Sequence, residues 1–338
     1  MRGRWWFAAP VLVLLLAGGY ALTRVRKPRA PSPPSLPPPT PDPRSFENRF
    51  TLEAHDPEVR AVAFSPDGVR LATAGLDRTI VLWDVAKGVK IRTLEGHEGW
   101  VLSLAFRADG RLLASGDGIG QIRVWDCRTW ESTAALGIHS DSIFTLTFAS
   151  DGKRILAGDS DGSVCGWEVQ TGAQSPTGSR HPAHVTAMAL GPDGRLLATG
   201  DEKGGLLVRD LQAGSSRREA TAHVGRVNSI AFTPDGTLLA TGGADGVVRL
   251  WDAEKETDAR VLGGHVGAVL SVAFSSDGRV LVSGGRDGTV RIWDRTGREV
   301  RRLEAHRGPV WSVAFRADGG LLATGGGDGR VRLWGMKP

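Results

Sequence analysis

A repeat of about 42 residues runs through most of this 338-residue chain and restricts what it can fold into. One copy is Gly264–Asp294, GHVGAVLSVAFSSDGRVLVSGGRDGTVRIWD, which has two runs with alternating apolar residues and two Asp-Gly turns. The histidine of the repeat recurs at five steps of 42 residues and one of 41, as His55, His97, His139, His181, His223, His265 and His306. Asp-Gly pairs recur in the same register, and tryptophan closes six of the seven units. The part of the chain from Arg49 onward is therefore seven copies of one unit.

A period of about 40–45 residues built from short strands is typical of a propeller blade. We therefore expect an all-β, seven-bladed β-propeller of four-stranded antiparallel blades over residues 49–338. The 46 glycines suit a fold with several tight turns in each blade. The internal repeat overrides the two-domain expectation that length alone would give.

The fixed offsets of histidine, Asp-Gly, aspartate and tryptophan resemble those of the WD-repeat β-propeller family, over Arg49–Trp334. The resemblance implies that a His, a Ser or Thr, an Asp and a Trp of one blade form a hydrogen-bonded chain, called a tetrad below. The matching residues are His55, Thr73, Asp77 and Trp83 in blade 1, His223, Thr241, Asp245 and Trp251 in blade 5, His265, Ser283, Asp287 and Trp293 in blade 6, and His306, Thr324, Asp328 and Trp334 in blade 7. A His, a Ser and an Asp also suggest a hydrolase triad, but catalysis needs one site and this set recurs, which indicates a structural role.

Blades 2, 3 and 4 depart from the tetrad pattern. Ile119 stands at the aspartate position of blade 2, and Ala157 stands at the Ser/Thr position of blade 3. In blade 4, Lys203 and Arg209 stand at the Asp and Trp positions. Each lost hydrogen bond should cost about 1 kcal/mol. We interpret these losses as drift that the ring tolerates, and a functional sector is the alternative.

The N-terminal region predicts a membrane anchor. Trp5–Leu22 is an uncharged run of 18 residues, and as a helix of about 27 Å it would just span a bilayer core. We expect residues 1–27 to be a retained single-pass transmembrane helix rather than a cleaved signal peptide, because Ala17-Gly18-Gly19 is a weak cleavage site. More basic residues follow the run than precede it, which favours a cytoplasmic propeller, although the short N-terminal tail could cross instead.

Residues 28–48 form a Pro-rich linker with nine prolines between Pro28 and Pro43. We expect an extended spacer, and a ligand for aromatic grooves is the alternative. Arg49–His55, RFTLEAH, resembles Val300–His306, VRRLEAH, which reads as an outer strand leading into a repeat histidine. Residues 49–54 are therefore predicted to pair with the C-terminal blade and close the ring, with Arg49–Leu52 beside Val331–Trp334.

Charge and cysteine content limit the classes of ligand and partner that we expect. The net charge is +5, but residues 1–49 carry +6, so the propeller itself is at −1 and lacks the basic surface of a general nucleic-acid binder. Cys127 and Cys165 lack metal-ligand spacing and are expected to be unpaired thiols. We predict no metal, no cofactor, no nucleic-acid partner and a monomeric propeller.

The entrance of the central channel is the predicted binding surface. Positions +3 and +5 from each repeat histidine lie where the inner strand starts, and alternation places +5 on the strand face of +7 and +9. The family resemblance implies that partners bind there. The candidate partner-binding residues are Arg60, Trp100, Leu102, Phe144, Arg226 and Trp311. Trp and Arg commonly anchor protein interfaces. The alternative is that the aromatic side chains plug the channel mouth. Trp130, which replaces a turn glycine, is expected to be exposed at the opposite rim.

These observations favour a non-catalytic scaffold that is tethered to a membrane and binds a protein or peptide. A propeller that senses a small ligand is one alternative. An enzymatic propeller is another, but it would need a metal or an acid–base cluster on the inner strands. Those positions hold mainly Ala, Ser, Thr and aliphatic residues, and only His184 lies outside the repeat histidines of the seven units.

Overall fold

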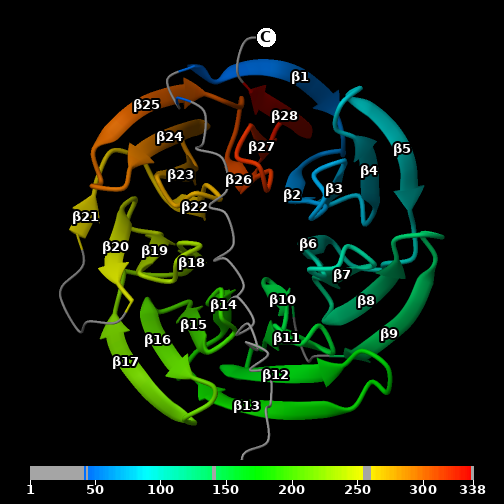
Figure 1. Ribbon diagram of the computed structural model, residues 1–338, viewed down its shortest axis with the longest axis vertical. Helices are drawn as coiled ribbons and strands as arrows, with labels where there is room; N and C mark the ends of the chain where they lie inside the picture. Colours follow the sequence, from blue (N-terminus) through cyan, green and yellow to red (C-terminus); the bar gives the residue numbers. More distant parts are fainter. Residues whose placement is uncertain (1–41, 43–44, 139–141, 254–259, 336–338) are drawn as a thin grey trace, which may run out of the picture. The chain divides into compact units, whose positions relative to one another are not determined.

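The propeller is described by a computed structural model that covers residue 42 and residues 45–138, 142–253 and 260–335. Within these ranges the chain forms 28 strands in seven four-stranded antiparallel sheets. The sheets surround a central axis, and the chain passes from one to the next around the ring (Figure 1). The prediction of a seven-bladed β-propeller with four-stranded blades is confirmed.

Each blade contributes one strand to each of four concentric positions. The inner strands are β2 (Val59–Phe64), β6 (Val101–Phe106), β10 (Leu146–Phe148), β14 (Val185–Leu190), β18 (Val227–Phe232), β22 (Val269–Phe274) and β26 (Val310–Phe315). The second strands are β3 (Arg70–Gly75), β7 (Leu112–Asp117), β11 (Arg154–Gly158), β15 (Leu196–Asp201), β19 (Leu238–Gly243), β23 (Val280–Gly285) and β27 (Leu321–Gly326).

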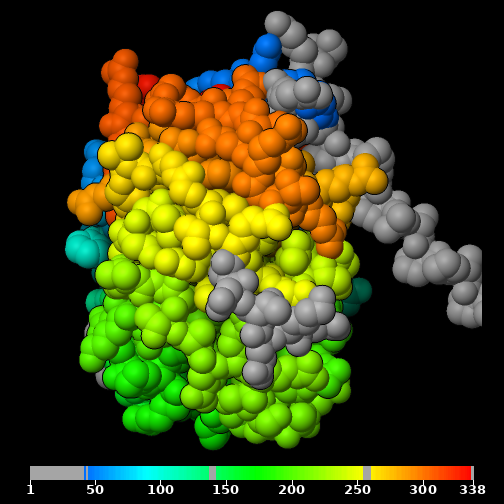
Figure 2. All heavy atoms as spheres, turned by 90° about the vertical axis from the view of Figure 1, so that its left-hand side faces the viewer, coloured from blue at the N-terminus to red at the C-terminus, as the bar shows by residue number. Residues whose placement is uncertain are grey.

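The third strands are β4 (Ile80–Asp84), β8 (Gln121–Asp126), β12 (Ser163–Glu168), β16 (Gly205–Asp210), β20 (Val248–Asp252), β24 (Thr289–Asp294) and β28 (Arg330–Gly335). The outer strands are β5 (Val89–Leu94), β9 (Ser132–Ile138), β13 (Gln174–Arg180), β17 (Ser215–Thr221), β21 (Arg260–Leu262), β25 (Glu299–Glu304) and β1 (Glu47–Glu53). Blades 6, 5 and 4 follow one another along one wall of the ring, coloured orange, yellow and green (Figure 2).

The Asp-Gly pairs form the turns between inner and second strands. In blade 1, Oδ1 of Asp67 accepts hydrogen bonds from the Ser65 hydroxyl at 2.5 Å and from the Val69 N–H at 3.0 Å. Gly68 adopts a φ of 68°, a conformation that favours glycine. The aspartate therefore holds a turn that the glycine makes possible.

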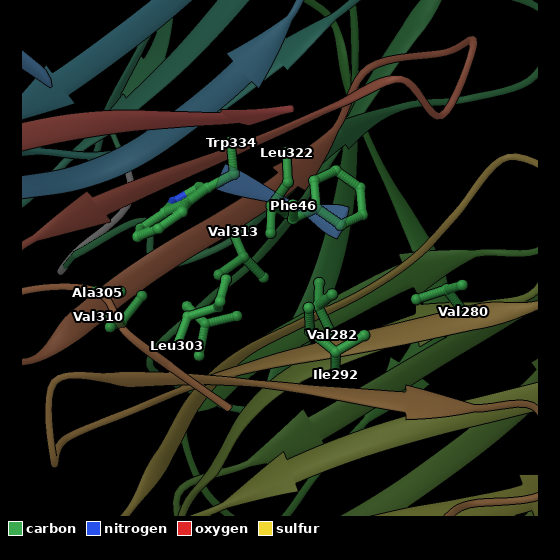
Figure 3. Packing of buried hydrophobic residues seen from close by; sticks show 11 residues of the cluster. Phe46, Val280, Val282, Ile292, Leu303, Ala305, Val310, Val313, Leu322 and Trp334 are labelled. Atoms are coloured by element: carbon green, nitrogen blue, oxygen red, sulfur yellow. The ribbon is translucent and has the colours of Figure 1, made fainter. Parts of the chain in front are cut away.

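The hydrophobic core lies between neighbouring blades. One cluster joins Val282 and Ile292 of blade 6 with Val313 and Leu322 of blade 7 (Figure 3). Because strand side chains alternate between the two faces of a sheet, each blade packs against both of its neighbours.

The first described strand completes the last blade. β1 pairs antiparallel with β28, so that Thr51 lies opposite Arg332 and Leu52 lies opposite Val331. The pairing begins at Glu47, two residues before Arg49, where the sequence pattern placed the start of the propeller. Phe46, directly before the strand, is fully buried in the cluster between blades 6 and 7 (Figure 3).

Serine side chains also link the inner strands around the channel. The hydroxyl of Ser312 in blade 7 accepts a hydrogen bond from the Val62 N–H of blade 1 at 3.2 Å. Ser271 accepts in the same way from the Val313 N–H at 3.1 Å. These small inner-strand residues therefore join one blade to the next.

The predicted anchor (residues 1–27) and most of the Pro-rich linker (residues 28–48) lie outside the described residues. Within the described ranges, no helix is long and apolar enough to cross a membrane.

Candidate functional site

The tetrads form inside the blades. In blade 1, Nδ1 of His55 lies 2.9 Å from Asp77, and Nε2 lies 2.9 Å from the Thr73 hydroxyl. The Trp83 indole N–H donates to the same hydroxyl at 3.0 Å. Blades 5, 6 and 7 repeat this arrangement, with His–Asp distances of 2.8, 3.1 and 2.7 Å. The chain of bonds lies within one blade, where it connects the loop carrying the histidine to the second and third strands.

The expected loss of the aspartate in blades 2 and 4 is wrong. In blade 2 the usual aspartate position holds Ile119, and Asp117 contacts the histidine instead. Its Oδ2 lies 2.8 Å from Nδ1 of His97. In blade 4 the usual aspartate position holds Lys203, and Asp201 contacts the histidine instead. Its Oδ2 lies 3.0 Å from Nδ1 of His181. Both aspartates stand two residues earlier than the usual one. A carboxylate acceptor is therefore kept in both blades.

Two substitutions in the pattern stand as real departures. Blade 4 has Arg209 where other blades have tryptophan, and its guanidinium donates to the Gly214 carbonyl at 2.6 Å. Blade 3 has Ala157, which is fully buried, beside the buried Trp167. The blade 3 histidine, His139, lies outside the described residues.

The tetrad environment lowers the pKa of both its acidic and its basic members. Burial raises the pKa of Asp328, but the hydrogen bond and charge of His306 and the Arg332 hydrogen bond outweigh it, so the pKa falls to about 2. Burial lowers the pKa of His306, and this effect is larger than the increase caused by the hydrogen bond and charge of Asp328. A neutral imidazole fits this geometry, because it donates from Nδ1 to the carboxylate and accepts at Nε2 from the hydroxyl. At neutral pH the histidine therefore stays neutral and the aspartate stays ionised, which suits a structural role better than proton transfer.

All seven +5 side chains line one cavity of about 250 Å³ in the channel. They are Arg60, Leu102, Phe144, Thr186, Asn228, Leu270 and Trp311. The regular alternation of side chains along the inner strand is interrupted at the +5 residue. In six blades a β-bulge falls there, as between Val59 and Ala61 in blade 1. Bulges redirect a side chain and are common beside binding sites. The bulge, and not the simple period of two, therefore sets the direction of the +5 side chain.

Arg60 and Trp311 form one stacked pair at the cavity. The guanidinium carbon of Arg60 lies 3.6 Å from the centre of the Trp311 ring. Glu58 holds the same guanidinium through a 3.3 Å ion pair. Burial lowers the pKa of Arg60, and Glu58 opposes that shift. Blades 7 and 1 therefore present a joint aromatic and cationic surface to the channel.

Phe144 and Arg226 form a second stacked pair. The guanidinium carbon of Arg226 lies 4.1 Å from the centre of the Phe144 ring, although the two residues belong to blades 5 and 3. His184 of the intervening blade lies 5.1 Å from Phe144, between ring centres. Burial lowers the pKa of Arg226, the charge of Arg60 lowers it further, and Glu202 raises it. The sequence pattern did not indicate a contact between alternate blades.

Trp100 lies apart from these pairs. It does not line the cavity, and 57% of its side chain is exposed. Ile119 is 51% exposed at the same end of blade 2, where the Gly118 N–H donates to the Trp100 carbonyl at 2.8 Å. Trp100 and Ile119 therefore form an exposed apolar pair beside the channel mouth, which we call the blade 2 patch.

The expectation that Trp130 is exposed is wrong. Its φ of 62° matches the turn glycine that it replaces, but only 8% of its side chain is exposed. The ring packs against Cys127 in the cluster between blades 1 and 2, and Arg70 lies over it at 5.2 Å. The neighbouring blade covers the side chain, which the local turn pattern could not show.

Across the described ranges, no group of three or more His, Cys, Asp and Glu side chains is placed to hold a metal ion. Cys127 and Cys165 are free and buried, and burial raises the pKa of Cys127 to about 12.

Seven four-stranded blades, with repeated tetrads and a channel lined by inner strands, define a WD-repeat β-propeller. More narrowly, the chain belongs to the family described as the IFT122 first beta-propeller, whose model matches residues 58–334. Propellers of this kind act as protein-interaction scaffolds in general.

Similarity to individual curated proteins is local. The chain is 43% identical over 60 residues to protein Mut11 of Chlamydomonas reinhardtii, which is 18% of this chain and 16% of that protein. It is 48% identical over 46 residues to WD repeat-containing protein 1-B of Xenopus laevis, which is 14% of this chain and 8% of that protein. The matched segments thus span less than a fifth of each of these relatives.

Proposed function

We propose that this protein is a non-catalytic scaffold that binds a protein or peptide at the mouth of its channel. The observation that carries the proposal is the gathering of Arg60, Phe144, Arg226 and Trp311 into two stacked pairs. Arg60, Phe144 and Trp311 line the cavity, and Arg226 lies against Phe144 without lining it. Aromatic residues and arginine are the side chains most enriched in the energetic centres of protein interfaces.

Exposed apolar side chains on the same face support this surface. Trp100 and Ile119 are joined by Val224 and Val266, which are 80% and 79% exposed. Val224 and Val266 directly follow tetrad histidines, so they lie at the blade ends where the inner strands start. Water-exposed apolar residues around a polar and aromatic centre suit a protein partner.

The cavity fits a side chain of a partner better than a free small molecule. Its volume of about 250 Å³ lies below the range of roughly 300–1,000 Å³ that ligand pockets usually have. A sensor for a small ligand is therefore the weaker candidate.

The proposed scaffold is tethered to a membrane by residues 1–27, with the propeller on the cytoplasmic side. The support is the apolar run Trp5–Leu22 and the basic residues that follow it. Fractionation of cells should recover the full-length protein with membranes after alkaline extraction. Soluble protein with a new N-terminus near Tyr20 or Ala21 would contradict the tether.

A displayed peptide library, selected on the immobilised full-length protein, tests the binding surface. Peptides selected on the native protein should bind Trp100→Ala, Phe144→Ala and Trp311→Ala more weakly, by about 2 kcal/mol or more for a true anchor. Ile91→Ala is the matched control, because Ile91 is 48% exposed on the outer strand β5. Equal affinity for all four variants would show that the channel mouth is not the binding surface.

A further inference from the structure

Three nitrogen atoms near the channel mouth are buried and lack a hydrogen-bond partner among the described residues. They are Nε of Arg226, Nε1 of Trp311 and Nε2 of His184. Each belongs to a side chain of the two stacked pairs or of the histidine beside Phe144. A buried donor without an acceptor costs about 1–3 kcal/mol, and more when it is charged. Nε of Arg226 and Nε1 of Trp311 can only donate, so these two atoms mark a place where an acceptor is needed, while Nε2 of His184 can donate or accept according to its tautomer.

The guanidinium of Arg226 lacks hydrogen-bond acceptors most clearly. Among the described residues it makes no ion pair and no hydrogen bond, and its contact with Phe144 covers only one face of the planar group. Stacking leaves the edge of a guanidinium, which carries the N–H groups, free to donate. Arg60 is similar, since Trp311 covers one face and Glu58 engages only Nη1.

We infer that this mouth binds a carboxylate side chain, from an acidic segment of a partner protein, between Arg60 and Arg226. The inference rests on the proposed function, because it names the chemistry of the partner at that site. A carboxylate only accepts hydrogen bonds, and its two oxygens match the paired N–H groups of a guanidinium. The indole N–H of Trp311 would complete the set of donors.

The neighbouring charges favour a single negative charge over a double one. Glu58 pairs with Arg60, and the charge of Glu202 acts on Arg226. Together with Arg60 and Arg226 these two acidic groups leave the mouth close to neutral, so a phosphate dianion would bring a larger uncompensated charge than a carboxylate. Glu202 is exposed and its charge acts on Arg226, so its own carboxylate could move toward that guanidinium. The experiment must therefore separate an internal acid from a partner's acid.

Calorimetric titration of the full-length protein in lipid nanodiscs provides the test. The probes are a capped hexapeptide of alternating Glu and Gly, its Gln counterpart and its phosphoserine counterpart. The variants are Arg226→Gln, Trp311→Phe, which keeps the stacked ring but removes the N–H, and Glu202→Gln. Arg286→Gln is the matched control, because Arg286 is exposed at the same end of blade 6 but belongs to neither stacked pair. Melting temperatures confirm that each variant folds.

We expect the Glu peptide to bind at least about tenfold more tightly than the Gln peptide, and Arg226→Gln to remove that difference. Trp311→Phe should weaken the Glu peptide by a few fold, Glu202→Gln should not weaken it, and Arg286→Gln should bind like the native protein. Equal binding of the Glu and Gln peptides, or an unchanged affinity in Arg226→Gln, would overturn the inference. Tighter binding of the phosphoserine peptide would overturn the choice of a carboxylate.

The library selection described above separates this inference from the proposed function. Selected peptides that depend on Trp100 and Trp311, but bind Arg226→Gln normally, would overturn the carboxylate site and leave the scaffold function standing. Selected peptides that ignore all of these residues would overturn both.

Discussion

Oδ2 of Asp117 lies 2.8 Å from Nδ1 of His97, with 0% and 1% of the two side chains exposed. In blade 1 the acceptor is Asp77, which is 27% exposed, and a glycine, Gly75, stands at the place that corresponds to Asp117. A Cβ on Gly75 would lie 2.6 Å from the Cβ of His55, so that blade leaves no room for a side chain there. The blades therefore present a carboxylate to the histidine in two different ways.

Asp117→Gly should lower the free energy of unfolding by about 2 kcal/mol or more, because it removes the acceptor of a buried imidazole N–H. Adding Ile119→Asp gives blade 2 the glycine and aspartate of blade 1, and should recover most of the loss. Urea denaturation of the native protein and both variants provides the measurement. A double variant no more stable than Asp117→Gly would show that the two arrangements cannot be exchanged.

Stability should fall as the pH falls below about 6.5. Burial lowers the pKa of His223, His265 and His306 below the ordinary 6.5. The pKa of Asp287 and of Asp328 falls to about 2, from an ordinary 3.8, since hydrogen bonds outweigh their burial. In both cases the unfolded chain binds more protons, so the contribution is complete above the unfolded pKa and is lost as the pH decreases.

Urea midpoints measured from pH 8 to pH 2.5 should therefore decline gently below about 6.5 and more steeply below about 4. Asp328→Asn should reduce the steeper part, because it removes one of the carboxylates responsible. A midpoint that stays constant between pH 7 and pH 3 would contradict the assignment.

Deletion of residues 1–53 should lower the melting temperature sharply, whereas deletion of residues 1–43 should not. The longer deletion removes β1 and exposes the edge of β28, while the shorter one keeps both β1 and the buried Phe46. Phe46→Ala alone should cost about 3 kcal/mol or more, because it leaves a cavity between blades 6 and 7. Equal melting temperatures for the two deletions would contradict the role of β1.

Truncation of two tryptophans should change the stability of the protein by very different amounts. Trp130→Gly relieves a positive φ, worth about 1 kcal/mol, but removes a buried ring worth about 3 kcal/mol or more, so the protein should be destabilised. Trp100→Ala should change stability by no more than about 0.5 kcal/mol, because Trp100 is largely exposed. Thermal denaturation would decide, and a large loss for Trp100→Ala would favour a packing role for the blade 2 patch.

The blade count and four-stranded sheets could be predicted from the sequence because they follow from a repeat. The tetrads of blades 2 and 4 could have been predicted too. In blades 2 and 4, where Ile119 and Lys203 replace the usual aspartate, Asp117 and Asp201 replace the glycine two residues earlier. A comparison of single positions cannot distinguish a relocated carboxylate from a lost one, whereas the two positions of each blade taken together can.

The channel mouth shows where sequence reasoning stops. The periodicity placed Arg60, Phe144 and Trp311 near the inner rim, and all three line the cavity. It could not show that Arg226 reaches Phe144 across blade 4, because that contact depends on the curvature of the ring. The burial of Trp130 depends in the same way on packing between blades.

The pairing of β1 with β28 has a consequence for how the chain folds. Six blades, such as the sheet β2–β5, are built from consecutive strands that can meet by closing short loops. Blade 7 must join Leu52 to Val331 across roughly 280 residues, which costs about 5 kcal/mol in loop-closure entropy, against about 2 kcal/mol for ten residues. Contacts at such separation slow folding. A circular permutant that starts at Asp56 and links Gly335 to Ser45, so that the buried Phe46 is kept, would make every blade local, and should fold faster with its fold unchanged.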